Sequence, residues 1–517
     1  MLFELILWGS LIATACGTST PTKSNTSTNS CVQLAAALPG QVYDPGTVNY
    51  TTETQYKISA DKNLNIAFFS KIAWLSPYCV FSPLTSGDLA TGVKILARSN
   101  TSFAIRSGGH AAVAGIASTD YGVMIATTSF TEKTLVPLPN DFGVPYLRAG
   151  AAFRWSDIYE FLEPYSLISV GGRVAPVGSS LVLGGGLSYH ASLYGWAANN
   201  VINFELVTAN GTILQVNDAT YPDLFWALKG GSNNFGVVTR YDLKTYESGL
   251  VFGGSVQWGA KATQQYLDAY TAYIAPGGGI DDANGNLMPD FSYNPMTGAE
   301  SSGTVYFYNG DDPSPKAFEN FTAIPTVSSE VGIMNFSAIV SQTEFFASLV
   351  NRWSWYDTSI LFSNETSELV YNIVVGNAKL QLSQVNCTVG FALEPMTVAM
   401  QHAAVASGGD AISLDPSKGN FLVAEIYVDW SNPNDDQPVK AFLTSTIAEI
   451  EEQTKAKGLY YPFKWLNDAG IGENPISSYG YGASLSKLRD ISKKYDPNGV
   501  FQKLVPGFKL GFDFAGV

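Results

Sequence analysis

The run Phe103-Ala-Ile-Arg-Ser-Gly-Gly-His-Ala-Ala-Val-Ala-Gly115 decides how the rest of the chain is interpreted. Its apolar start predicts a strand, which ends abruptly at residues 106–110 and enters a tight loop. Two adjacent glycines let bare backbone N–H groups approach an anion, and Arg106 would supply a nearby positive charge. A histidine beside two glycines is more often a turn residue, so His110 alone decides nothing. A second glycine cluster, at residues 184–186, shifts the balance toward a ligand site.

Length and composition limit the classes of protein that this sequence can encode. A chain of 517 residues has room for two domains with large hydrophobic cores. Charged residues make up only 14%, against about a quarter in an average protein. The formal net charge is −15 and no cluster of lysines and arginines occurs, which argues against nucleic-acid partners.

The N-terminus predicts entry into the secretory pathway. Residues 1–17 contain an apolar core followed by small residues, which is typical of a signal peptide and too short to span a membrane. A buried N-terminal helix is the alternative, because no Lys or Arg precedes the core. The Thr-, Ser- and Asn-rich stretch 18–30 is expected to be disordered. Acceptor tripeptides for glycosylation, which suit a secreted protein, occur at Asn25, Asn49, Asn100, Asn210, Asn320, Asn335, Asn364 and Asn386.

Cysteine usage fits the same compartment. If Cys16 is removed with the signal peptide, Cys31, Cys79 and Cys387 remain in the mature chain. We predict a Cys31–Cys79 disulfide and a buried free thiol at Cys387, because disulfides persist in oxidising compartments. The mature protein is expected outside the cell or in a vacuole, without a membrane span and, by default, as a monomer.

Strands and helices are expected to alternate around the two glycine clusters. We expect helices within 83–100, at 155–162 and from 221 onward, and strands at 122–126, 146–151 and 235–243. Residues 201–216 predict a hairpin with Asn210-Gly211 as its turn. Three consecutive glycines disfavour regular structure, so a structural bulge or a close backbone approach is expected at 184–186.

Six motifs follow one another along the chain, and the ordered set is more informative than any single motif. They are Arg106-Ser-Gly-Gly-His110, Gly171-Gly-Arg, Leu183-Gly-Gly-Gly186, Tyr194-Gly-Trp-Ala-Ala-Asn-Asn-Val201, Asp223-Leu-Phe-Trp-Ala-Leu-Lys-Gly-Gly231 and Asn233-Asn-Phe-Gly-Val-Val-Thr239. Together they resemble the flavin-binding domain of berberine-bridge-enzyme-like FAD-linked oxidases, most closely the fungal branch. Residues 487–501 are similar to the ending of that family, and the resemblance covers essentially the whole mature chain.

The resemblance implies an α+β protein with the vanillyl-alcohol-oxidase/PCMH-type fold. A two-part FAD-binding domain would occupy 31–248, a substrate domain 249–456, and a segment returning to the FAD domain 457–517. The residues agree with this division, because aromatic strands and amphipathic helices alternate after about residue 251. That alternation predicts a sheet covered by helices, which in this family is antiparallel.

The resemblance also implies which residues hold the cofactor. The loop 106–110 would cradle the FAD pyrophosphate, with His110 bonded covalently to the flavin 8α-methyl carbon. Many relatives carry a second tether through a Cys where this chain has Val174, so attachment through one histidine is expected. Val177 matches the position where oxidases admit O₂. The full set expected to contact FAD is Arg106, Ser107, Gly108, Gly109, His110, Gly115, Val174, Val177, Gly178, Gly185, Gly186, Asn199, Val201, Gly236, Val237, Val238 and Asn467.

Glu425 is the main candidate for a catalytic base. Alternation along residues 421–430 places Glu425 and Tyr427 on the same face of a strand. Burial of a carboxyl in mid-strand raises its pKa, which suits a general base. Relatives place a catalytic Glu or Gln at the matching position, facing the flavin. The alternative is that Glu425 faces solvent or an arginine on an edge strand.

A second candidate region is Trp465-Leu-Asn-Asp468, where relatives commonly have Tyr-x-Asn-Tyr. Asn467 keeps the match and would contact the flavin. Asp468 replaces the tyrosine and would act as an acid/base group or cap the following turn. Candidates for the substrate pocket are Tyr189, His190, Tyr427 and Trp465, although packing roles fit Tyr189 and His190 better.

These features predict an FAD-dependent oxidase of a small secondary metabolite. A base would remove a substrate proton while hydride passes to flavin N5, and O₂ would then be reduced to H₂O₂. Two alternatives stay open: a carbohydrate oxidase, and a flavoprotein that isomerises or cyclises its substrate without net redox turnover. Three scattered histidines cannot form a conventional zinc site, and neither a Gly-x-Ser-x-Gly elbow nor a Walker loop occurs.

Overall fold

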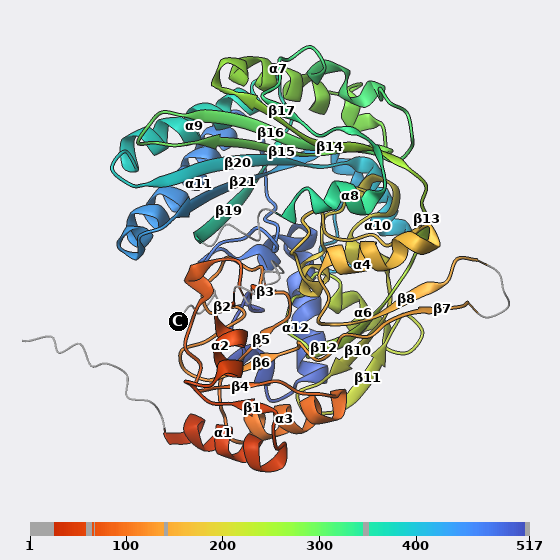
Figure 1. Cartoon of the computed structure of the whole chain (residues 1–517), viewed down its shortest axis with the longest axis vertical. Coiled ribbons are helices and arrows are strands. Elements are labelled where there is room, and N and C mark those ends of the chain that lie inside the picture. The colour runs from red at the N-terminus through yellow and green to blue at the C-terminus, as the bar shows by residue number, and fades with distance from the viewer. Residues whose placement is uncertain (1–24, 58–64, 67, 139–142, 345–350, 512–517) are drawn as a thin grey trace, which may run out of the picture.

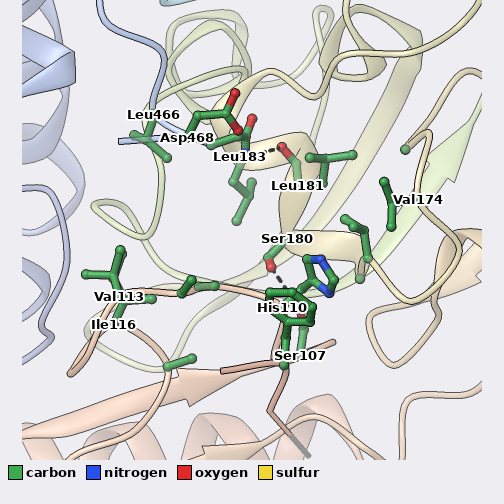
Figure 2. A pocket seen from close by; sticks show the side chains of 18 of the residues that line it. Ser107, His110, Val113, Ile116, Val174, Ser180, Leu181, Leu183, Leu466 and Asp468 are labelled. Atoms are coloured by element: carbon green, nitrogen blue, oxygen red, sulfur yellow. Dashed lines mark hydrogen bonds between the residues drawn. The ribbon is translucent and has the colours of Figure 1, made fainter. Parts of the chain in front are cut away.

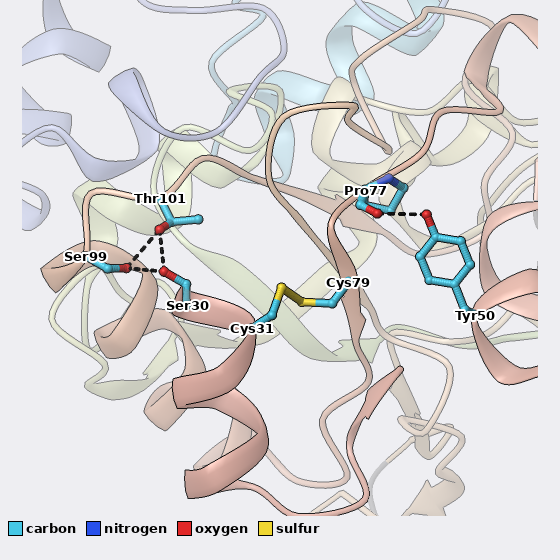
Figure 3. Close-up of a disulfide and its surroundings, with 7 residues drawn as sticks. All are labelled: Ser30, Cys31, Tyr50, Pro77, Cys79, Ser99 and Thr101. Carbon is cyan, nitrogen blue, oxygen red and sulfur yellow. Dashed lines mark hydrogen bonds between the residues drawn. A yellow bond between two sulfur atoms is a disulfide. The ribbon is translucent and has the colours of Figure 1, made fainter. Parts of the chain in front are cut away.

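The computed structural model describes residues 25–57, 65–66, 68–138, 143–344 and 351–511 (Figure 1). The predicted signal peptide and residues 18–24 lie outside the described residues. The expectation of disorder was wrong for residues 25–30, because helix α1 begins at Asn25 and continues to Ala37. The buried Ser30 hydroxyl is hydrogen-bonded to Ser99 and Thr101 (Figure 3). These contacts anchor the helix to the body of the protein.

A disulfide fixes the same segment. Cys31 of α1 is bonded to Cys79 of strand β4 (Cys79–Phe81), which confirms the predicted pairing (Figure 3). Cys387 is a buried free thiol, also as predicted. Just before β4, the Pro77 carbonyl accepts the Tyr50 hydroxyl at 2.7 Å. The N-terminal segment is thus tied to the first sheet at several points.

Removing this disulfide is expected to lower stability. In a Cys31→Ala/Cys79→Ala variant, the unfolded chain regains the freedom that closing a loop between positions 48 residues apart removes. We expect a loss of about 2–5 kcal/mol in the free energy of unfolding, measured by denaturant titration. Reductant serves as the control, because it should destabilise the parent and leave the double variant unchanged. Equal sensitivity of both proteins to reductant would contradict the prediction.

The N-terminal half contains two sheets that share one core (Figure 1). In the first sheet, β4, β6 (Val123–Ala126) and β5 (Phe103–Arg106) run parallel, and β1 (Val42–Tyr43) pairs antiparallel with β4. The second sheet is antiparallel, in the order β11 (Ile213–Val216), β10 (Val201–Val207), β12 (Val237–Leu243), β8 (Tyr146–Gly150) and β7 (Lys133–Val136). The predicted hairpin at 201–216 is confirmed.

Helix α3 (Ser86–Arg98) lies between β4 and β5 in the chain and begins where the sequence predicts. Thr85 and Asp88 form a capping box at its start, and Leu89 and Val93 are fully buried on its inner face. The loop at 107–122 therefore leaves the carboxyl end of a buried parallel strand. Ligand sites of open parallel sheets lie at that end.

The second half of the chain forms one antiparallel nine-stranded sheet. Its strands are, in order, β17 (Ser328–Ser329), β14 (Val251–Gly259), β16 (Glu300–Tyr308), β15 (Gly285–Tyr293), β20 (Cys387–Met396), β21 (Phe421–Trp430), β19 (Arg352–Leu361) and β22 (Tyr460–Tyr461), with β18 (Gly332–Met334) also paired to β14. Helices α7 (Thr263–Ile274), α9 (Thr366–Gln381) and α11 (Asp436–Ala456) cover its outer face (Figure 1). The inner face turns toward the N-terminal half, and the expected antiparallel sheet under helices is confirmed.

The C-terminal segment returns to the N-terminal half. Lys494 of α12 (Ala483–Tyr495) is hydrogen-bonded to Asp223 of α6 (Pro222–Leu228) at 2.7 Å. After α13 (Val500–Lys503), the Leu504 carbonyl accepts the Phe103 N–H at 2.8 Å. The remaining α-helices and strands of the described residues are α2 (Val48–Thr54), α4 (Trp155–Leu162), α5 (Ala191–Tyr194), α8 (Phe336–Ser341), α10 (Val398–Ala406), β2 (Tyr56–Lys57), β3 (Asn65–Ile66), β9 (Leu167–Ile168) and β13 (Tyr246–Glu247).

Candidate active site

A cavity of about 360 Å³ lies where the glycine loops of the N-terminal half meet the inner face of the nine-stranded sheet. Its wall includes His110 from the loop after β5, Val174 from the loop after β9, and Glu425 from β21. Asp468 comes from the C-terminal segment and lies above His110 in the view of Figure 2. The fold thus assembles one site from four distant parts of the chain.

Two glycines explain why the loops around residues 108 and 178 meet. A Cβ added at Gly108 would lie 2.4 Å from the Gly178 Cα, and one added at Gly178 would lie 2.4 Å from the Gly108 Cα. Real Cβ contacts are not that short, so only glycine fits at either position. The Ser107 hydroxyl donates to Ser180 Oγ at 3.0 Å across the same junction (Figure 2). The segment leading into the triple glycine is therefore held against the first glycine pair.

His110 lines the cavity as a neutral imidazole. Its ring stacks on Phe69, with ring centroids 4.3 Å apart. Burial, together with the nearby Arg154 guanidinium, lowers the pKa of His110 to about 3. At neutral pH the ring therefore keeps a nitrogen lone pair, which is what a bond through that nitrogen requires.

Asn467 connects the triple glycine to the C-terminal segment. Its Oδ1 accepts the Gly186 N–H at 3.2 Å, and its Nδ2 donates to the Leu181 carbonyl at 3.3 Å. Gly185 and Gly186 have φ values of +103° and +79°, in the region that favours glycine. A Cβ at Gly185 would also lie 2.5 Å from the Ile412 Cδ1. The triple glycine is thus a tightly packed turn behind the cavity wall.

Most residues expected to contact FAD line the cavity, and several do not. Those in the wall are Ser107, Gly109, His110, Val174, Val177, Gly178, Gly236, Val237, Val238 and Asn467. Those outside its lining are Arg106, Gly108, Gly115, Gly185, Gly186, Asn199 and Val201.

The role expected for Arg106 needs correction, because its guanidinium is paired with Glu53 and cannot serve as a free counter-charge. The Asn199 amide donates to buried Asp410 at 2.9 Å and so fixes a loop.

Tyr189 and His190 were candidates for the pocket, with packing as the favoured role, and neither lines the cavity. Both are 1% exposed and lie outside the cavity lining. The His190 ring packs against Phe307 and Phe336, with centroids 4.5 and 4.9 Å away. These contacts fit the favoured packing role, and the aromatic partners come from the substrate half. Tyr427 and Trp465 do line the cavity.

Glu425 lies in mid-strand on β21, between β20 and β19, which excludes the edge-strand alternative. Its side chain lines the cavity together with that of Tyr427, on the face that the alternation predicts. Burial raises the pKa of Glu425 to about 8, and the Glu394 carboxylate adds to the rise. In its ionised form, a carboxylate with a raised pKa is a stronger base than an ordinary glutamate.

Glu394 and Arg173 are site residues that the sequence interpretation did not assign. Arg173 donates to both carboxylate oxygens of Glu394, each at 2.7 Å, and both side chains line the cavity. Because Arg173 follows the Gly171-Gly motif and Glu394 lies on β20, this buried ion pair joins the two halves of the protein. Asp468 lies in the same wall, and burial together with the charge of Glu425 raises its pKa well above the usual range.

Two further carboxyls lie near Glu425 on the same sheet, one on the adjacent strand β19 and one on β15, beyond β20. Asp290 of β15 accepts the Tyr427 hydroxyl at 2.5 Å, and burial raises the pKa of Asp290 to about 6. Asp357 of β19 is paired with Glu425 in the β19–β21 register, and its carboxylate accepts the Trp465 N–H at 2.5 Å. Like charges in directly opposed positions repel, so the pair favours a protonated carboxyl at one of them. Alternation along β19 could have shown which face Asp357 shares, but not that it lies opposite Glu425, which depends on the β19–β21 register.

Comparison with known proteins identifies the family. Residues 77–217 match the family model described as an FAD binding domain. FAD-dependent monooxygenase prx3 of Penicillium roqueforti is 35% identical over 494 residues, which cover 93% of each chain. The chain belongs to the family of FAD-dependent oxidoreductases that includes prx3, and it shares the fold of berberine-bridge-enzyme-like proteins. This family member is also 33% identical to the bifunctional solanapyrone synthase of Alternaria solani over 453 residues, 86% of this chain and 84% of the relative.

Solved structures of berberine-bridge-like and oligosaccharide oxidases share the fold. Physcomitrella patens BBE-like 1 superposes with a TM-score of 0.72 at 18% identity, covering 93% of this chain and 99% of that one. The xylooligosaccharide oxidase of Myceliophthora thermophila C1 gives a TM-score of 0.72 at 18% identity, covering 94% and 100%. The expected PCMH-type fold and FAD cofactor are thus confirmed, and this berberine-bridge-like protein is an FAD-linked oxidoreductase.

The cavity fits the flavin cofactor chemically. The close approach of Gly108 and Gly178 leaves backbone, rather than side chains, at one end of the cavity, and Val113 and Val174 provide apolar walls (Figure 2).

Within the described residues, no group of three or more His, Cys, Asp or Glu side chains could hold a metal ion. No helix in that part of the chain is long and apolar enough to cross a membrane.

Proposed function

We propose that the protein is an FAD-dependent oxidase that removes a proton and a hydride from a small organic substrate, such as a secondary metabolite. The observation that carries the proposal is the half-buried Glu425 carboxyl, held on an interior strand in the wall of the cavity that His110 also lines. With its pKa raised to about 8, Glu425 would take the substrate proton. FAD, when bound, supplies the hydride acceptor at its N5 atom.

Neighbouring side chains would position the substrate and tune the base. Trp353, Trp355 and Tyr427 present aromatic surface beside Glu425, which would orient a largely apolar substrate and exclude water. The Arg173 guanidinium opposes the rise in the pKa of Glu425. Because Glu394 holds Arg173 in place, this positive charge stays beside the base while the substrate proton is removed.

The proposal includes attachment of FAD through His110 alone. The neutral His110 ring in the cavity wall has the lone pair that such a bond needs. Val174, in the same wall, occupies the position where relatives resembling this chain carry a second tether. A valine side chain has no atom that can form that bond.

The proposal also places the protein in the secretory pathway. The disulfide between Cys31 and Cys79 suits an oxidising compartment. The expected acceptor asparagines are exposed at positions 49, 100, 210, 320, 335, 364 and 386. The side chain of Asn25 lies outside the described residues.

The decisive experiment measures whether oxygen atoms from O₂ enter the product, because the relatives include proteins named monooxygenases. Metabolites are first screened for bleaching of the flavin absorbance without O₂. The active substrate is then turned over under ¹⁸O₂ while H₂O₂ is measured. An oxidase forms H₂O₂ in equal amount to product and leaves the product free of ¹⁸O. An ¹⁸O atom in the product, or conversion without O₂ consumption, would overturn the proposal.

A further inference from the structure

Lys509 is a buried cation that the site described above does not use. It is 5% exposed, and its Nζ donates to Asn233 Oδ1 at 2.9 Å and to Asn234 Oδ1 at 3.4 Å. Arg106 and Arg173 are each paired with a glutamate, whereas Lys509 forms no ion pair within the described part of the chain. A buried ammonium without an anion is costly, which raises the question of what compensates it.

The contacts of Lys509 lead directly to the cavity wall. Asn233 lines the cavity and donates through Nδ2 to the Pro506 carbonyl at 2.9 Å. Phe508, the residue before Lys509, also lines the cavity, and its carbonyl accepts the Asn234 amide at 2.9 Å. The C-terminal tail and the loop before β12 therefore form one clamp. The Lys509 ammonium lies behind Asn233 within this clamp.

Other charged groups around Lys509 are already engaged. Asp496 acts on it electrostatically, but the Asp496 carboxylate accepts the Val500 and Phe501 N–H groups at 2.9 and 2.7 Å. On the α12 side, the Arg489 guanidinium donates to the Leu510 carbonyl at 3.4 Å. Burial lowers the pKa of Lys509 to about 7, so without a bound anion the side chain is partly neutral near neutral pH.

We propose that Lys509 supplies the positive charge that balances the phosphates of bound FAD, so that FAD binding is coupled to protonation of this side chain. The pyrophosphate brings two negative charges into a cavity whose wall arginine, Arg173, is already neutralised by Glu394. Through a low-dielectric wall these charges stabilise the ammonium form, and one proton moves from solvent to Lys509 Nζ. Lys509 does not line the cavity, so its charge acts across the part of the wall that Asn233 forms. The inference rests on FAD binding alone and not on the oxidase chemistry.

The test measures proton uptake during FAD binding to the full chain. A His110→Ala/Glu425→Gln background makes binding reversible and removes the other cavity group that titrates near pH 8. Calorimetric titrations with FAD at about pH 8 are compared in phosphate and Tris buffers, whose ionisation enthalpies differ. We expect uptake of close to one proton per FAD, and an affinity that falls up to about tenfold per pH unit above pH 7. With Lys509→Met added, the uptake disappears and the affinity becomes independent of pH in that range. Lys503→Met, an exposed lysine on the adjacent helix α13, should keep the uptake.

A folding defect in Lys509→Met would not confound the proton-uptake test. Lys509→Met replaces a buried unpaired charge by an apolar side chain, so the FAD-free variant should melt no lower than its parent at neutral pH. The buffer comparison in the parent is informative even if the variant fails to fold. Absence of proton uptake in the parent, or unchanged uptake in a folded Lys509→Met variant, would overturn the proposal.

Discussion

Glu425→Gln is expected to slow anaerobic flavin reduction by ~10²-fold or more, the usual contribution of a general base. Glutamine keeps the size and hydrogen-bonding capacity of the side chain but cannot take up the substrate proton. Stopped-flow absorbance at saturating substrate measures the rate, and the flavin spectrum confirms that FAD content is unchanged. Asp429→Asn is the matched control, because Asp429 lies on the same face of β21 outside the cavity lining. A Glu425→Gln rate within a few-fold of the parent rate would exclude Glu425 as the base.

The pH dependence of the same variant has a definite sign. Only the ionised carboxylate accepts a proton, so the parent rate should rise with pH and level off above about 8, while the variant stays flat. In the folded protein the pKa of Glu425 lies above its unfolded value of about 4.3, so the folded state holds the proton more tightly. This contribution to stability is complete below the unfolded pKa and is lost as pH rises to about 8. Glu425→Gln should therefore gain stability relative to the parent as pH increases.

Local sequence signals were sufficient to predict the helix and the hairpin of the domain that carries the glycine loop. The Thr85 capping box marks the start of α3, and Asn210-Gly211 marks the turn of the β10–β11 hairpin. Composition wrongly predicted disorder at residues 25–30. The prediction rested on the lack of apolar side chains to bury in this Ser- and Asn-rich segment. Its order comes instead from the disulfide at Cys31 and the buried hydroxyl of Ser30. Both depend on partners far along the chain.

The candidate site shows the same division between local and distant information. Period-two alternation was enough to place Glu425 on the same face of β21 as Tyr427, because it needs only the strand itself. That this face lines the cavity is known from the structure. The carboxyl of Asp357 could not be assigned, since its place opposite Glu425 depends on the β19–β21 register. Arg106 was placed correctly beside the loop, but its partner Glu53 lies on α2 and removes its charge from the site. Motif neighbours are thus predictable, whereas the electrostatic state of the site depends on tertiary pairing.

His110→Ala is expected to abolish covalent attachment of FAD completely. Alanine has no atom that can bond to the flavin, and Val174 leaves no second tether in the cavity wall. After acid precipitation, the parent pellet should stay yellow, and the variant should release all its flavin to the supernatant.

His402→Ala is the control for that experiment, because His402 is exposed on α10 and should keep its bound colour. A yellow pellet from His110→Ala would require another attachment point, and release of flavin from the parent would show that no covalent bond exists. In either case the contact between Gly108 and Gly178 would still position the loops around the cofactor. The histidine would then be a flavin contact, held neutral by the burial that lowers its pKa to about 3.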